Sequence, residues 1–128
     1  DRALLMGADR RDMLLSLKPV MDLAGLRSAQ KAVLAVHTAD AVMDYLQDLV
    51  AATRSGRWFV QGLSPRAALA VVRAAKVQAW MDGRDYVAPD DITAVLPQTI
   101  AHRMVITGDA GRGPLDQVRA MIEAVPLP

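Results

Sequence analysis

The sequence predicts a mainly α-helical bundle. Hydrophobic residues make up 52% of the chain but aromatic residues only 4%, so alanine, leucine, valine and methionine supply most of the apolar surface. These residues favour helices with small side chains at their contacts. Apolar positions recur at spacings of three and four residues, and no segment reads as a strand of useful length.

The composition also limits the classes of function. The chain has 128 residues, enough for one domain, and its 15 basic and 14 acidic residues give a net charge of +1. This balance argues against a protein whose main task is to bind nucleic acid. The absence of cysteine excludes disulfides, thiolate zinc sites and cysteine nucleophiles. No apolar run approaches the roughly 18 residues of a membrane span. We therefore expect a cytoplasmic protein without a nucleic-acid partner.

The N-terminal part predicts a helix followed by a connector. The chain begins at Asp1 in what reads as the middle of a helix, so we expect a piece of a longer protein; a trimmed small protein is the alternative. Asp9 is expected to cap a helix that ends near Pro19. Residues 21–29 read as a connector, and residues 29–37 as a short helix.

A clear amphipathic helix follows. Thr38 is expected to open it, and Ser55-Gly56 to end it. Its apolar residues repeat at i, i+3, i+4, i+7 and i+11, which predicts one buried stripe: Val42, Tyr45, Leu46, Leu49 and Thr53. An acidic row lies on another face: Asp40, Asp44 and Asp48. We interpret this row as a solvated face rather than as a partner-binding edge.

Two short segments, at residues 57–61 and 86–87, read as extended, and residues 58–60 are able to form a short two-stranded pairing with residues 86–87. Trp58 and Phe59 are expected at the edge of the core rather than as an aromatic platform for a ligand.

The longest predicted helix runs from Pro65 to about Met81. Ser64 suits its N-cap, and proline fits the first helical position. The predicted buried stripe consists of Ala68, Leu69, Val72, Ala75 and Ala79. Arg66 and Arg73 are seven residues apart and therefore share another face.

The C-terminal part predicts further helices. Pro89 begins the first, and Pro97 is expected to break it and to start another that reaches Ile106. After a loop, residues 113–125 form a final amphipathic helix with five apolar residues inward: Leu115, Val118, Met121, Ile122 and Val125.

Motifs for chemistry by the chain alone are missing. There is no GxxxxGK[ST], HExxH, EF-hand loop or GxSxG. His37 and His102 are far apart and have no metal-ligand partner at helical spacing. Most acidic residues lie at helix starts or on solvent faces, where capping and the helix dipole explain them. The sequence therefore predicts no metal site and makes a poor case for a free-standing enzyme.

Arg66 stands out because it falls at about the second position of a helix. The partial positive charge of a helix start disfavours a cation there by a few tenths to about 1 kcal/mol. A bound phosphate would offset this repulsion, since it suits both the free N–H groups and the arginine fork. An arginine that lies along the helix or pairs with a nearby acid is the alternative, and the residues alone leave both open.

The stretch from Gly62 to Ile106 closely resembles the C-terminal lid of MoxR-type AAA+ ATPases. That family typically shows G-x-S-P-R-A, then G-R-x-Y-V-x-P-x-D, then a proline before H-R. The matching residues here are Gly62, Ser64 to Ala67, Gly83 to Val87, Pro89, Asp91, Pro97 and His102-Arg103. The likeness extends more weakly over most of the chain, whereas Ala88 stands where the family often has a capping threonine.

The resemblance implies site residues. Arg66 would be the sensor-2 arginine, on a helix at about residues 65–81, and would reach the γ-phosphate of ATP held by a larger ATPase core. Gly62, Leu63 and Ala67 would flank the nucleotide near its base or ribose.

The resemblance also implies an architecture and partners. Residues 28–128 would be the helical AAA+ lid subdomain, and residues 1–27 a helical segment and connector from the ATPase core. The parent would bind and hydrolyse ATP with Mg²⁺ as a ring, most often a hexamer. It would act as a chaperone-like machine that matures or activates partner complexes, including von Willebrand factor A proteins. The chain alone is expected to be inactive.

Two other classes remain as alternatives. A stand-alone helical protein-interaction module would bind a partner helix or peptide in its apolar grooves, with Arg66 and Arg73 as a rim. A helix-turn-helix DNA binder is disfavoured, because its recognition helix should be basic and the chain is nearly neutral.

Overall fold

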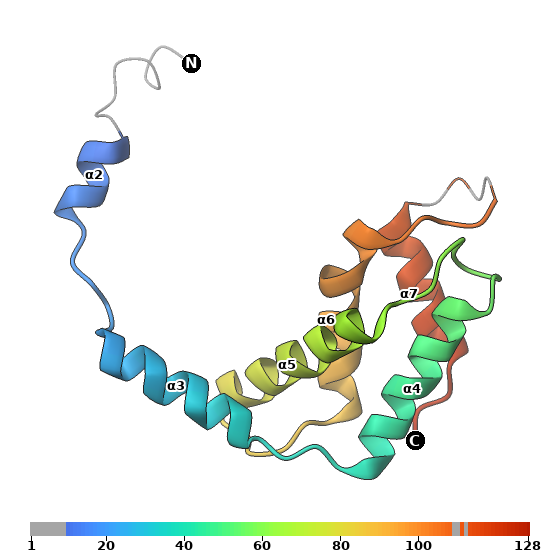
Figure 1. Cartoon of the computed structure of the whole chain (residues 1–128), viewed down its shortest axis with the longest axis horizontal. Coiled ribbons are helices and arrows are strands. Elements are labelled where there is room, and N and C mark those ends of the chain that lie inside the picture. Colours follow the sequence, from blue (N-terminus) through green and yellow to red (C-terminus); the bar gives the residue numbers. More distant parts are fainter. Residues whose placement is uncertain (1–9, 109–110, 112) are drawn as a thin grey trace.

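The computed structural model describes residues 10–108, 111 and 113–128. Its helices are, in chain order, α2 (Arg10–Ser16), α3 (Leu23–Ala35), α4 (Asp40–Arg54), α5 (Pro65–Met81), α6 (Pro89–Ile100), the short 3-10 helix η1 (Ala101–Arg103) and α7 (Pro114–Ala124). Helices α4 to α7 form the body, α3 packs on α5 and leads away from it, and α2 stands apart (Figure 1). The predicted mainly α-helical bundle is confirmed.

Helix α4 has the predicted buried stripe, and all five of its residues are buried. The acidic row is exposed, as expected of a solvated face. The predicted start is wrong, because α4 begins at Asp40 and Thr38 makes no cap. His37 forms a parallel bridge with Tyr86, and its amide donates to the Asp85 carbonyl over 2.7 Å. This pairing keeps the chain extended up to the start of the helix.

Helix α5 has the predicted bounds, and the Ser64 hydroxyl accepts from the Ala67 amide over 3.3 Å. Its predicted buried stripe is partly wrong, since Leu69 is 59% exposed, and Ala68 and Val72 are only half-buried. The buried residues instead recur at every fourth position: Ala67, Val71, Ala75 and Ala79. Small residues along this row let α6 pack closely against α5.

Pro97 does not end α6 as predicted. The helix continues to Ile100, where η1 follows, and Pro97 is buried inside it. A proline within a helix removes one backbone hydrogen bond and crowds the preceding turn. Burial of Leu96, Pro97 and Ile100 in the core offsets this local cost, so tertiary packing overrides the local preference.

The inward face of α7 is as predicted except at Leu115, which is 39% exposed. Gln117 is buried instead, and its side-chain amide donates to the Trp58 carbonyl over 3.4 Å. Trp58 itself is half-buried at the edge of the core, as expected, whereas the same expectation is wrong for Phe59, which is fully buried inside the core.

The extended segments pair differently from the prediction. Phe59 forms an antiparallel bridge with Ile106, while residues 86–87 lie beside His37 rather than beside residues 58–60. The predicted partners precede and follow α5, whose 17 residues span about 25 Å. A straight helix of that length places them at opposite ends of the body.

Helix α3 begins earlier than predicted. Asp22 Oδ1 accepts from the Gly25 amide over 2.7 Å and caps a helix from Leu23, so the expected connector is wrong from that residue on. The helix crosses the expected boundary between residues 27 and 28, and the division of the chain there stays a prediction. The expected cap at Asp9 lies outside the described residues.

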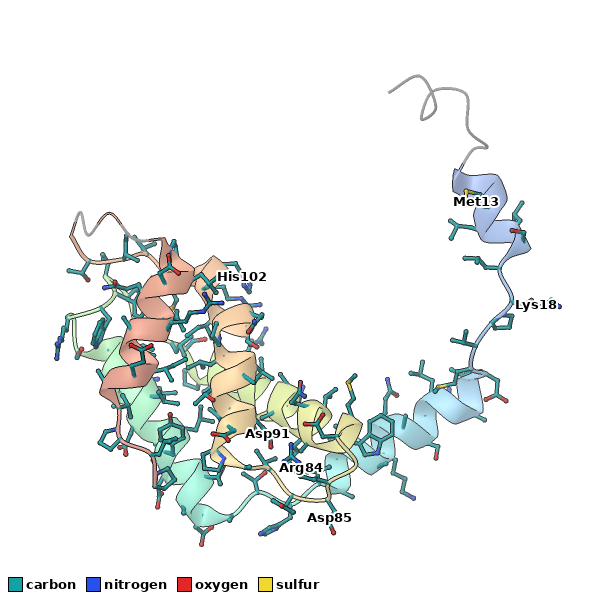
Figure 2. The ribbon with its side chains drawn as sticks, turned by 180° about the vertical axis from the view of Figure 1, so that it is seen from behind. Met13, Lys18, Arg84, Asp85, Asp91 and His102 are labelled. Atoms are coloured by element: carbon teal, nitrogen blue, oxygen red, sulfur yellow. The ribbon has the colours of Figure 1, made fainter. Side chains whose placement is uncertain are left out.

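An ion pair joins the end of α5 to the start of α6. Arg84 Nη1 and Nη2 donate to the two carboxylate oxygens of Asp91 over 2.7 and 2.6 Å (Figure 2). The same carboxylate accepts from the Ala88 amide over 2.7 Å, and its side chain is only 4% exposed. The hydrogen bond from Arg84 is the main reason that the pKa of Asp91 is lowered and the pKa of Arg84 raised.

We predict that Asp91→Asn lowers the free energy of unfolding by about 2 kcal/mol at pH 7, since hydrogen bonds to charged groups are worth about 1.5–3 kcal/mol. Folding lowers the pKa of Asp91. The stabilisation is therefore present above the carboxyl's unfolded pKa of about 3.9 and is lost as the pH falls through the folded value. Urea unfolding should show that the difference in free energy of unfolding between the parent protein and Asp91→Asn becomes smaller from pH 7 to pH 3. A difference of unchanged size would contradict the assignment.

Candidate functional site

The turn before α5 is fixed to the last turn of α4 through the Leu63 backbone. The Leu63 amide donates to Thr53 Oγ1 over 3.0 Å, and the Leu63 carbonyl accepts from Arg54 Nε and Nη2 over 3.1 and 2.8 Å. The Thr53 hydroxyl in turn donates to the Val50 carbonyl over 2.6 Å. Side chains of α4 thus satisfy both the amide and the carbonyl group of Leu63.

Gly62 lets this turn approach α4 closely. A Cβ atom at this position would lie 2.9 Å from the Arg54 Cα atom and would also overlap the Arg54 side chain. Any larger residue would therefore push the turn away from the helix that anchors it.

Arg66 lies on the first turn of α5 and is exposed. Pro65 has no N–H group, and Ser64 accepts from the Ala67 amide through its hydroxyl and from the Ala68 amide through its carbonyl, at 3.1 Å. The Arg66 amide, in contrast, donates to no acceptor within the described ranges. The turn therefore offers an anion one backbone N–H and the arginine fork.

The guanidinium of Arg66 forms no ion pair with a carboxylate of the described residues. The alternative of a nearby acid partner therefore gains no support from them. Arg73 is exposed seven residues further along the same helix, as predicted.

Three of the four predicted nucleotide residues lie together. Gly62, Leu63 and Ala67 line a pocket of about 170 Å³ at the start of α5, and Arg66 is next to it on the helix. The opposite wall comes from the end of η1 and the residue after it, Arg103 and Met104. The sequence marked Arg103 only as part of the H-R element of the family resemblance. Nothing in the sequence placed Arg103 beside Gly62.

A larger groove runs between α4 and α5, with a volume of about 680 Å³. Its lining is mostly apolar: Met43, Leu46, Val50, Ala51, Pro65, Ala68, Leu69 and Val72. The exposed position of Leu69 places it in this groove rather than in the core. The sequence suggested apolar grooves only in general terms, for an interaction module, and it did not place one between α4 and α5.

Metal-ligating residues do not gather in the described part of the chain. It contains no group of three or more His, Cys, Asp or Glu side chains that could hold a metal ion. His37 and His102 are exposed, and His102 Nε2 accepts from Arg103 Nε over 2.9 Å. Nor is any described helix both long and apolar enough to cross a membrane.

Comparison with known proteins gives consistent results. The AAA lid domain family matches residues 51–124. Protein MoxR of Methylorubrum extorquens is 44% identical over 71 residues, which are 52% of this chain and 21% of that protein. Chaperone MoxR1 of Mycobacterium tuberculosis is 40% identical over 79 residues, which are 55% of this chain and 21% of that protein. The uncharacterized protein YeaC of Bacillus subtilis is 33% identical over 116 residues, which are 88% of this chain and 36% of that protein.

Among solved structures, a candidate ATPase from Cytophaga hutchinsonii is similar to this chain. The TM-score is 0.69 at 26% identity, over 77% of this chain and 33% of the other. The chain thus spans between 21% and 36% of the length of the three curated relatives.

We predict that Thr53→Val destabilises the protein by about 1–3 kcal/mol, because it leaves the buried Leu63 amide without an acceptor. Hydrogen exchange of that amide should also accelerate. Ser55→Ala is the matched control at the same helix end: Ser55 Oγ donates to the Ala52 carbonyl at an exposed position, and its loss should change stability by less than about 0.5 kcal/mol. Equal effects of the two substitutions would show that the Leu63 turn is not anchored as described.

Proposed function

This chain belongs to the AAA lid domain family and is similar to MoxR proteins, and from this premise we propose that Arg66 contacts the γ-phosphate of ATP held by an upstream AAA+ core. The observation that carries the proposal is the placement of Arg66. Arg66 is exposed on the first turn of α5 and directly precedes Ala67, which lines a pocket. Its guanidinium has no ion-pair partner among the described residues.

The geometry of the turn supports a role for the side chain more than for the backbone. Most N–H groups at the start of α5 are missing or already paired within the turn. An anion would therefore be held mainly by the guanidinium, whose two parallel N–H groups match phosphate oxygens. The dipole of the helix adds a favourable field at the same point.

The chemistry follows from where charge develops. During hydrolysis, negative charge is spread over the oxygens of the transferred phosphoryl group, and a positioned arginine stabilises it. Arg66 would supply that charge and, by touching only the triphosphate state, would couple the angle of the lid to the bound nucleotide. Mg²⁺, the phosphate loop and the attacking water would belong to the upstream core.

The N-terminal arm supports an upstream domain. It carries exposed apolar side chains along its length: Met13, Leu14, Leu15, Leu17, Val20 and Met21. Figure 2 shows Met13 and Lys18 on this arm, away from the helical body. Apolar surface of this extent normally lies against another protein surface, and the core is the proposed partner.

At the level of the whole protein, we extend the proposal to a ring-forming ATPase, most often a hexamer, in the cytoplasm. It would use ATP with Mg²⁺ to remodel partner complexes in the manner of a chaperone, von Willebrand factor A proteins among them. The chain alone carries no phosphate loop and should not hydrolyse ATP.

One observation favours a second function. The apolar groove between α4 and α5 has the character of a site for a partner helix or peptide. A stand-alone interaction module would use this groove without any nucleotide. Dependence of partner binding on ATP separates the two functions.

We predict that Arg66→Ala in the full-length ATPase lowers kcat by about 100-fold or more, as expected when a donor to developing charge is removed. The fold should survive, because the side chain is exposed. Steady-state ATP hydrolysis, with a thermal unfolding curve beside it, measures both effects.

Arg73→Ala is the matched control for Arg66→Ala. This residue lies on the same exposed face two helical turns away, so it changes the net charge equally but should leave kcat within about twofold. Hydrolysis at the parental rate by Arg66→Ala, or equal losses in both variants, would contradict the proposed role of Arg66.

A further inference from the structure

The pocket at the start of α5 has a second cation on its rim. Arg103 ends η1 and lines this pocket together with Gly62 and Leu63, although about forty residues separate them in the sequence. The bridge between Phe59 and Ile106 holds the two segments side by side, and the Val60 amide donates to the Val105 carbonyl over 2.8 Å. The fold therefore fixes which residues face each other across the pocket.

The lining of the pocket suits a flat, partly apolar group. Leu63, Ala67 and Met104 are buried beneath it, with exposed fractions of 4%, 5% and 6%. On the rim, the amide and carbonyl of Gly62 make no backbone hydrogen bond within the described residues. An apolar floor bounded by unpaired peptide groups favours a heterocyclic base, which has an apolar face and a polar edge, over a phosphate group.

The Arg103 side chain is oriented by its neighbour. Arg103 Nε donates to His102 Nε2 over 2.9 Å, and this hydrogen bond leaves the two Nη groups without a partner in the described part of the chain. A guanidinium group is planar and stacks on π-systems, which a compact ammonium group does less well.

We propose that Arg103 contacts the purine base of the same nucleotide whose γ-phosphate lies at Arg66. This inference rests on the proposed function and assigns the base to the pocket of Gly62, Leu63, Ala67 and Met104. Ala67 lines the pocket and directly follows Arg66, so the base and phosphate ends of one nucleotide meet neighbouring parts of α5. His102 is a positioning residue that holds the guanidinium plane.

The test compares ligands that share phosphates but differ in the base. Dissociation constants of ATP, ADP and inorganic triphosphate would be measured by calorimetry for the full-length ATPase and for Arg103→Gln. The substitution should weaken ATP and ADP alike, by about 3- to 30-fold, as expected for a lost cation–π contact. Binding of inorganic triphosphate should not change.

Two further variants make the outcome decisive. Arg119→Gln removes an exposed arginine of α7 whose one ion-pair partner among the described residues is Asp116, at 3.8 Å, and it should leave the binding of all three ligands unchanged. Arg103→Lys keeps the charge but loses the planar guanidinium, so it should still bind ATP more weakly than the parent protein. Full rescue by lysine, equal weakening of inorganic triphosphate, or unchanged ATP binding by Arg103→Gln would each overturn the assignment.

The same measurements separate this proposal from the one on which it rests. Arg66→Ala should weaken ATP and inorganic triphosphate but affect ADP much less. If Arg66→Ala binds all ligands normally while Arg103→Gln loses ATP and ADP, the γ-phosphate contact fails and the base pocket stands. If Arg103→Gln binds all ligands normally while Arg66→Ala loses ATP and inorganic triphosphate, the base contact of Arg103 fails and the γ-phosphate contact of Arg66 stands.

Discussion

The site depends on the three hydrogen bonds by which the side chains of Thr53 and Arg54, in the last turn of α4, hold the backbone of Leu63. Thr53 accepts from its amide, Arg54 donates to its carbonyl, and the missing side chain of Gly62 allows the approach. Because Leu63 is itself buried, this anchor also fixes the residues that follow it. The cap and first turn of α5, and with them the direction of Arg66, are therefore set by a helix that is packed into the core along its whole apolar stripe.

The other end of α5 is held as firmly. The buried small residues of α5 let α6 pack closely, and the hydrogen-bonded pair of Arg84 and Asp91 joins the two helices where the chain turns between them. A helix fixed at both ends and along one side moves as part of the body. A force applied at Arg66 by a bound nucleotide would thus displace the whole helical unit rather than bend one helix, which is what a lid requires.

The sequence predicts this fold well where local signals act alone. The Ser64-Pro65 start of α5 and the apolar period of α4 are local, and both are confirmed. Pro97 shows the limit of local signals. The packing of other segments around α6 stabilises this helix by more than the proline destabilises it. The assignment of Arg66, Gly62, Leu63 and Ala67 to a nucleotide site rests on a family resemblance and stays a prediction. Thr53 and Arg103 were missed as site residues because tertiary contacts place them there, and no local pattern encodes those contacts.

The most direct test of the account is amide hydrogen exchange across residues 61–67 in the full-length parent protein, measured without nucleotide, with ADP and with a non-hydrolysable ATP analogue. If the Leu63-anchored turn delivers Arg66 to the γ-phosphate, exchange in this segment should slow further with the ATP analogue than with ADP. The exposed C-terminal end of α5 should not change between the two nucleotides. Equal exchange of residues 61–67 in all three states would contradict the claim that this turn is where the lid meets ATP.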